Sequence, residues 1–325
     1  MPVLVAGSIA TDHLMHFPGR FSEQLLADQL HKVSLSFLVD DLVFRRGGVA
    51  PNICYGMAQL GGRPVLIGAV GEDFGDYRGW LERHNVDCSY VYVSDTHHTA
   101  RFVCTTDEDM CQIGSFYAGA MPEARQIELR TAWTATGANL AVISAYDPDS
   151  MVQHSNECRE RGYRFAADPS QQIARMDGAQ LMSLIDGAEM LFTNDYEKSL
   201  LESKTGLSEA EVLKRVDVRV TTLGSKGVEI VGRELDPVHV PVAKERAKAD
   251  PTGVGDAFRA GLLTAREDWQ LSWERAAQVG SLLATMVLET VGTQEYQVKA
   301  AEFADRLAES YGDDAAAEVL PHLPA

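Results

Sequence analysis

The chain has 325 residues, 45% hydrophobic and 23% charged, which is the composition of an ordinary folded protein with one large core or two unequal ones. Its formal net charge of −18 repels nucleic-acid phosphates and anionic membrane surfaces, so neither is expected as a partner. The five cysteines are widely spaced and lack a C-x-x-C pair, which argues against a disulfide framework or a zinc site.

The predicted strands are short apolar runs, and most of them precede a segment with helical periodicity. They cover residues 3–6, 64–70, 140–144, 164–167, 190–193, 219–223 and 227–231. The predicted helices cover 52–60, 75–84, 153–161, 196–204, 208–214, 256–265, 273–288 and 299–311. This alternation predicts an α/β fold with a doubly wound, mainly parallel sheet flanked by helices on both faces.

Two stretches, 12–46 and 100–116, interrupt this alternation with strand-like patterns such as the one at 33–37. Because both are insertions between α/β units, we expect them to form a small β-sheet lid over the mouth of the main sheet. The α/β domain then comprises 1–11, 47–99 and 117–325. No apolar run reaches the roughly 18 residues of a membrane span, and the first strand lacks the flanks of a signal peptide, so a cytoplasmic protein is expected.

The sequence DPTGVGD at 250–256 opens an apolar helix. The two glycines, Gly253 and Gly255, can adopt backbone angles that other residues avoid, so the amides of Gly253, Val254 and Gly255 can converge on one phosphoryl group. Asp256 beside this anion hole then predicts a carboxylate that orients an attacking hydroxyl and finally accepts its proton. Taken alone, the same residues fit a turn followed by a helix N-cap.

Further polar and aromatic residues fit a sugar-like ligand. In the sequence GGVAPN at 47–52, Gly48 permits a close backbone approach and Asn52 can offer its amide to a hydroxyl, although two glycines also make a generic tight turn. The carboxylate of Asp12 can accept from the 2′ and 3′ hydroxyls of ribose, or else cap a turn. Phe102 and Phe116, on the predicted lid strands, can sandwich a flat base or form the lid's own core.

The two glycine motifs, in this order and at this separation, resemble the two signatures of the ribokinase-like PfkB carbohydrate kinase family, whereas the P-loop sequence G-x-x-x-x-G-K-[ST] is absent. Residues 194–197 resemble the N-x-x-E motif of that family, which implies that Glu197 acts through water on the Mg²⁺ of Mg-ATP, although Asn194 and Glu197 also fit a capping box. Residues 222–227 resemble the T-L-G-x-x-G loop under the nucleotide, and also fit a hairpin turn. The ATP contacts implied are Asn194, Thr222, Gly224, Gly227, Thr252, Gly253 and Gly255.

Residues 7–21, 110–121 and 167–172 are similar to the adenosine kinase branch of the family found in actinobacteria. This resemblance implies transfer of the ATP γ-phosphoryl to the 5′-hydroxyl of adenosine, giving AMP and ADP in purine salvage. It implies that ribose contacts Asp12, Gly48 and Asn52, that adenine stacks on Phe102 and Phe116, and that Ser8, Ser36, Gln171 and Gln172 lie near the polar edges of adenine. Arg175 would face the phosphoryl group, together with the anion hole.

The family resemblance also implies a homodimer through the lid, which would cover open strand edges. The sequence does not decide whether K⁺ binds near the loop after Leu288. A sugar kinase acting on ribose or a ketohexose such as fructose, and a catalytically silent nucleoside-binding regulator, are the alternatives. Pro251 and Val254 depart from the family pattern, and Val254 is expected to narrow the anion hole slightly.

Overall fold

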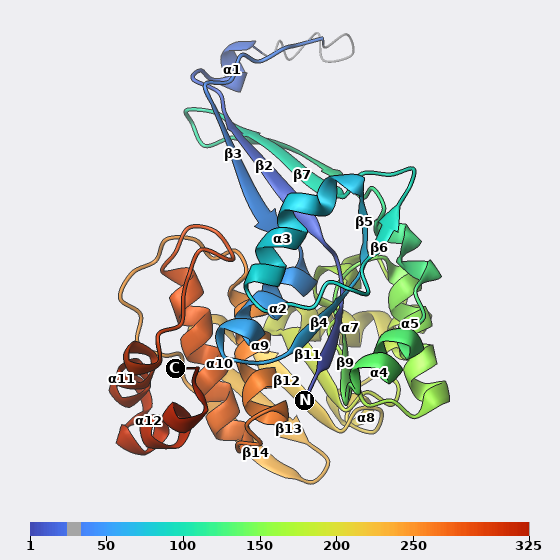
Figure 1. Ribbon diagram of the computed structural model, residues 1–325, viewed down its shortest axis with the longest axis vertical. Coiled ribbons are helices and arrows are strands. Elements are labelled where there is room, and N and C mark those ends of the chain that lie inside the picture. The colour runs from blue at the N-terminus through green and yellow to red at the C-terminus, as the bar shows by residue number, and fades with distance from the viewer. Residues whose placement is uncertain (25–33, 325) are drawn as a thin grey trace.

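A sheet of eight strands forms the centre of the molecule in the computed structural model, which describes residues 1–24 and 34–324 (Figure 1). The spatial order is β14 (Leu235–Val240), β13 (Val228–Gly232), β12 (Val218–Thr222), β11 (Met190–Asn194), β10 (Phe165–Ala167), β9 (Leu140–Ile143), β1 (Val3–Ala6) and β4 (Pro64–Ile67). Neighbours from β12 to β4 pair in parallel, and β13 and β14 add an antiparallel edge. The predicted doubly wound, mainly parallel sheet is confirmed.

Helices cover both faces of this sheet because its strands are apolar on both sides. Val3 and Val5 of β1 pack into one core cluster, and Leu4 and Ala6 pack into the other. The first cluster includes α2 (Val49–Gln59), α3 (Gly75–Arg83), α9 (Val254–Glu267), α10 (Trp273–Leu288), α11 (Ala300–Tyr311) and α12 (Asp313–Val319). The second includes α4 (Leu129–Thr136), α5 (Pro148–Arg161), α6 (Gly178–Ile185), α7 (Asp195–Thr205) and α8 (Glu209–Val212). Within the described ranges, no helix combines the length and apolar composition needed to cross a bilayer.

A second, four-stranded sheet projects from one end of the main sheet (Figure 1). Its order is β3 (Asp41–Gly47), β2 (Ala10–His16), β7 (Ala100–Thr106) and β8 (Gln112–Tyr117), and α1 (Phe21–Gln24) lies at its far end. A separate pair of short parallel strands is formed by β5 (Ala69–Gly71), which follows β4 of the main sheet, and β6 (Tyr92–Ser94), which precedes β7 of the small sheet. Only Gly7, Ser8 and Ile9 separate β1 from β2, so the small sheet grows directly out of the main one.

The strand predicted at 33–37 is wrong for the residues that the structure describes. Residues 34–39 have no regular secondary structure, β3 begins only at Asp41, and Val33 lies outside the described residues. The ring of Phe37 lies 5.0 Å from the rings of both Phe17 and Phe21. Phe37 therefore completes an aromatic cluster at the tip of the small sheet, and this packing replaces strand pairing.

Candidate active site

A cavity of about 340 Å³ lies where the carboxyl end of the main sheet meets the small sheet. Its walls come from β2 and β8, from the N-termini of α2 and α9, and from the segment after β10. The lining residues are Ser8, Ala10, Asp12, Gly48, Val49, Asn52, Phe116, Met121, Gln171, Gln172, Arg175, Thr252, Gly253 and Asp256. Residues predicted from widely separated motifs thus meet in one place, at the edge of the sheet where α/β proteins bind ligands.

Some residues assigned to the substrate lie elsewhere. Ser36 is exposed in the 34–39 segment and is not in the cavity wall, because no strand directs it there. Phe102 is the cross-strand partner of Phe116, but its ring covers Gly114, where an added Cβ would lie 3.0 Å away. The two aromatic rings therefore share one face of the small sheet, and of the two only Phe116 lines the cavity.

The two glycines before Asp256 have different structural roles. Gly253 has a φ of 77°, in the left-handed region, and forms the N-cap of α9. Gly255 lies inside α9 without a positive φ, but an added Cβ would lie only 2.8 Å from Nη1 of Arg259. The expected need for unusual backbone angles thus holds for Gly253 and is wrong for Gly255. The expected narrowing by Val254 is also wrong, because its side chain packs against the main core.

A chain of hydrogen bonds fixes the carboxylate of Asp256. Asn52 Nδ2 donates to Asp256 Oδ2 at 2.9 Å, and Gln294 Nε2 donates to Asn52 Oδ1 at 2.9 Å. Trp80 Nε1 in turn donates to Gln294 Oε1 at 3.1 Å. Burial raises the pKa of Asp256 to about 7, and the positive charge of Arg259 opposes this rise. The carboxylate is thus poised near neutral pH, as a general base requires.

The proposed substrate side of the cavity holds a second carboxylate, from Asp12, and the amide of Gln172, whose oxygen is unpaired. Asp12 is half-buried beside Gly47, and burial raises its pKa. Gln172 is 6% exposed, and among the described residues its Oε1 has no hydrogen-bond partner. Ser8 has a structural role, because its hydroxyl accepts from the backbone N–H of Val49 at 3.2 Å at the start of α2. At the same helix start, the φ of Gly48 is 95° and an added Cβ would lie 2.4 Å from the carbonyl oxygen of Ser8.

Four of the residues predicted to contact ATP, Asn194, Thr222, Gly224 and Gly227, lie at or just after the carboxyl ends of β11 and β12, where Asn194 and Thr222 are register partners. The other three, Thr252, Gly253 and Gly255, lie at the start of α9. Asn194 Oδ1 accepts from the Glu197 N–H at 2.7 Å, and Glu197 Oε2 accepts from the Asn194 N–H at 2.8 Å, so the capping box is present. The hairpin turn at 222–227 is also present, because Leu223 N–H donates to the carbonyl of Gly227 at 2.7 Å. Gly224 and Gly227 both have positive φ there.

The acidic side chains fit a magnesium ion held mainly by phosphates and water. Over residues 1–24 and 34–324, no three His, Cys, Asp or Glu side chains gather in a metal-binding group. Burial raises the pKa of Glu197, and one of its oxygens is already bound in the capping box. Mg²⁺ keeps several waters and takes few protein ligands at nucleotide sites, so Glu197 suits a contact through water.

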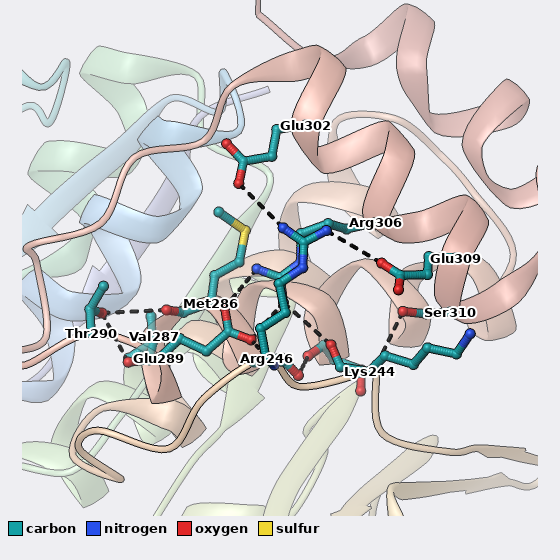
Figure 2. Close-up of polar contacts among 12 residues, drawn as sticks. Lys244, Arg246, Met286, Val287, Glu289, Thr290, Glu302, Arg306, Glu309 and Ser310 are labelled. Atoms are coloured by element: carbon teal, nitrogen blue, oxygen red, sulfur yellow. Dashed lines mark hydrogen bonds and ion pairs between the residues drawn. The ribbon is translucent and has the colours of Figure 1, made fainter.

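The loop between β14 and α9 is tied to the C-terminal helices (Figure 2). Arg306 pairs with Glu289 through both Nη atoms at 2.7 and 2.8 Å, and Glu289 also accepts from the Arg246 backbone N–H at 2.7 Å. The guanidinium of Arg246 pairs with Glu309 at 3.4 Å and with Glu302 at 3.9 Å (Figure 2). Arg246 is thus matched by acidic partners, and the network holds the loop that leads to Gly253.

A doubly wound sheet with a cavity at its carboxyl edge and a helix N-terminus aimed into it is the architecture of ribokinase-like phosphotransferases. The sequence profile of the pfkB family carbohydrate kinases matches residues 9–300. The chain therefore belongs to the PfkB family of carbohydrate kinases, which are ATP-dependent phosphotransferases with a hydroxyl acceptor.

Several relatives cover nearly the whole chain. The nucleoside kinase of Burkholderia thailandensis, solved in complex with inosine, is 34% identical with a TM-score of 0.81, and the match covers 95% of this chain and 98% of that one. The nucleoside kinase of Methanothermobacter thermautotrophicus is 27% identical over 315 residues, covering 95% of this chain and 96% of the relative. A fructokinase of Salmonella typhimurium is 30% identical over 233 residues, covering 67% of this chain and 75% of the relative.

Proposed function

We propose that this chain is a nucleoside kinase that transfers the γ-phosphoryl of ATP to the 5′-hydroxyl of a purine nucleoside, with adenosine as the substrate that the sequence favours. The observation that carries this proposal is the buried, unpaired Oε1 of Gln172 in the same cavity as Asp12 and Asp256. An unpaired buried acceptor is costly unless a ligand donates to it, and the N–H groups of adenine or hypoxanthine can do so. A free sugar lacks such a base and could satisfy this oxygen only through one of its own hydroxyls. The similarity to nucleoside kinases supports the same substrate class.

Asp256 would act as the base in this reaction. Its Oδ2 is bound by Asn52, so Oδ1 would accept the hydrogen bond of the 5′-hydroxyl and finally its proton. The amides of Gly253, Val254 and Gly255 at the start of α9, with Arg175, would hold the charge of the transferring group. Mg²⁺, held through water by Glu197, would supply charge neutralisation at the ATP phosphates. Asn194, Thr222, Gly224, Gly227 and Thr252 would hold the nucleotide.

Residues 12–46 and 100–116 would act as the lid that excludes water from this reaction, and 1–11, 47–99 and 117–325 as the domain that binds both substrates. Asp12, Gly48 and Asn52 would bind ribose, and Phe116 with Phe102 would contact the base. An intact Asp256 beside a helix N-terminus supports an enzyme over a silent nucleoside-binding regulator, which has no use for a base at that position.

The decisive experiment is a coupled ADP-release assay with Mg-ATP and, in parallel, adenosine, inosine, guanosine, ribose and fructose. Turnover on purine nucleosides, lost in Asp256→Asn and kept in the matched control Asp149→Asn on α5, is the expected result. Turnover only on a free sugar would move the chain to the sugar kinases of the same family. Nucleoside binding without any turnover would instead identify a regulator.

A further inference from the structure

Arg259 lies among carboxylates that come from different elements. It is 8% exposed, on the second turn of α9, and Asp168, just after β10, is fully buried. Arg259 Nη2 lies 2.6 Å from Asp168 Oδ1, so the two groups form a close ion pair. Arg259 Nη1 lies 3.9 Å from Asp256 Oδ1. One guanidinium therefore faces both the proposed base and a second, deeper carboxylate.

The position of this guanidinium is tightly bounded. A Cβ on Gly255 would lie 2.8 Å from Nη1, so only glycine leaves this space free. The guanidinium carbon lies 6.0 Å from the ring centre of Phe192 on β11. A direct arginine–carboxylate hydrogen bond is about 2.7 to 2.9 Å long, so the 3.9 Å to Asp256 marks a charge held close but not bonded.

We propose that Asp168 holds Arg259 back from Asp256, so that Arg259 keeps the base negatively charged while Oδ1 stays free for the substrate hydroxyl. Arg259 is then a positioning residue, because it acts on the reaction through Asp256. This inference rests on the proposed role of Asp256 as the base. It gives a function to the buried ion pair of Arg259 and Asp168, which the proposed substrate contacts do not include.

The charges around Asp256 fix the sign of the expected effects. Besides Arg259 and Asp168, the neighbouring groups are Tyr296 after α10, which Asp256 acts on, and Asp12 on β2 and Arg175 after β10, which line the same cavity. Glu197 on α7 raises the pKa of Arg259. Burial raises the pKa of Asp256 to about 7, so kcat/KM should increase as pH rises through about 7 and level off above it. Loss of the Arg259 charge should move this acidic limb to higher pH. Loss of the Asp168 charge should release Arg259 toward Asp256 and move the limb to lower pH.

The test compares the pH dependence of kcat/KM in Arg259→Met, Arg259→Lys and Asp168→Asn. We expect Arg259→Met to move the acidic limb to higher pH by about one unit, so that kcat/KM at pH values below the limb falls about tenfold. Arg259→Lys keeps a positive charge and should show a smaller shift. Asp168→Asn should move the limb downward and lower kcat, since Arg259 then occupies Oδ1. If the two changes acted only through lost packing, the acidic limbs of Arg259→Met and Asp168→Asn would move in the same direction. That result would overturn the inference, and so would limbs that do not move.

A second readout keeps the test independent of turnover. The carboxyl ¹³C resonance of Asp256, assigned by its loss in Asp256→Asn, should titrate at higher pH in Arg259→Met than in the wild type and near the wild-type value in Arg259→Lys. If Asp168→Asn does not fold, this pair of variants decides the matter, and equal titration in both would overturn the inference. If the enzyme acts only on a free sugar, and the pH limbs of Arg259→Met and Asp168→Asn still move in opposite directions, the role of Arg259 is upheld and the proposed nucleoside substrate is contradicted.

Discussion

Gln171 and Gln172 are adjacent in the chain but have different surroundings. Gln171 is exposed, whereas Gln172 is buried with an unpaired Oε1. We predict that Gln172→Leu raises KM for the nucleoside about tenfold and leaves kcat nearly unchanged, because a bond to the base contributes equally before and during phosphoryl transfer. Steady-state kinetics check this, with Gln153→Leu, an exposed change on α5 outside the cavity, as the matched control. Equal effects of the two changes would exclude a specific role for Gln172.

Single residues were predictable where their chemistry is local. Gly253 and Asp256 lie within one short motif, and Asn52 within another, so residue type and spacing indicated them. Gln294, by contrast, bonds Asn52 across 242 positions, and no motif marks it. Arg259 is read from sequence as one more residue of an apolar helix, and only its contact with Asp168 reveals a buried charge pair.

At the start of α7, Glu197 belongs to the capping box and is also the proposed water-mediated contact to Mg²⁺. In Glu197→Gln the amide oxygen can still accept from the Asn194 N–H, so the melting temperature should change by less than about 2 °C. The Mg²⁺ concentration for half-maximal rate should increase severalfold, because the negative charge is lost. Thermal melts and Mg²⁺ titrations test both parts. Glu211→Gln, in the matching capping box of α8, should change neither, and an unchanged Mg²⁺ requirement in Glu197→Gln would contradict the role.

Elements were predicted best where burial dictates the pattern. The parallel strands are continuous apolar runs because both of their faces are covered, and each run was recognised. β14 was missed because Pro237 interrupts it, and proline is tolerated there since β14 is an edge strand. The short helices α4, α6 and α12 were also missed, and α5 begins earlier than predicted, at Pro148. Their few turns carry too little periodicity to stand out.

At the scale of the whole molecule, the small sheet has an exposed apolar face that points away from the cavity. Leu42, Phe44, Ile113 and Tyr117 share this face by strand register and are 48%, 63%, 45% and 44% exposed. Such a patch favours burial against a second copy of the chain, and we propose that it forms the homodimer interface that the family resemblance leads us to expect.

We predict that Phe44→Glu converts a dimer to a monomer in sedimentation velocity at micromolar concentration, because a buried unpaired charge is costly. Leu320→Glu, a change at a residue 47% exposed near the C-terminus, is the control and should leave the dimer intact. A wild-type protein that sediments as a monomer would contradict the proposal, and so would a Phe44→Glu protein that stays dimeric.

Gly255 and Arg259 constrain the order in which the site can change during evolution. A methyl group at 255 would meet the guanidinium at 2.8 Å and push it off Asp168, so Gly255→Ala should be harmful in the present sequence. Once residue 259 is shorter, the same alanine meets no such obstacle, and alanine suits the interior of a helix better than glycine does. A change that begins at 255 must therefore displace the guanidinium, whereas a change that begins at 259 avoids this clash but first gives up the ion pair with Asp168.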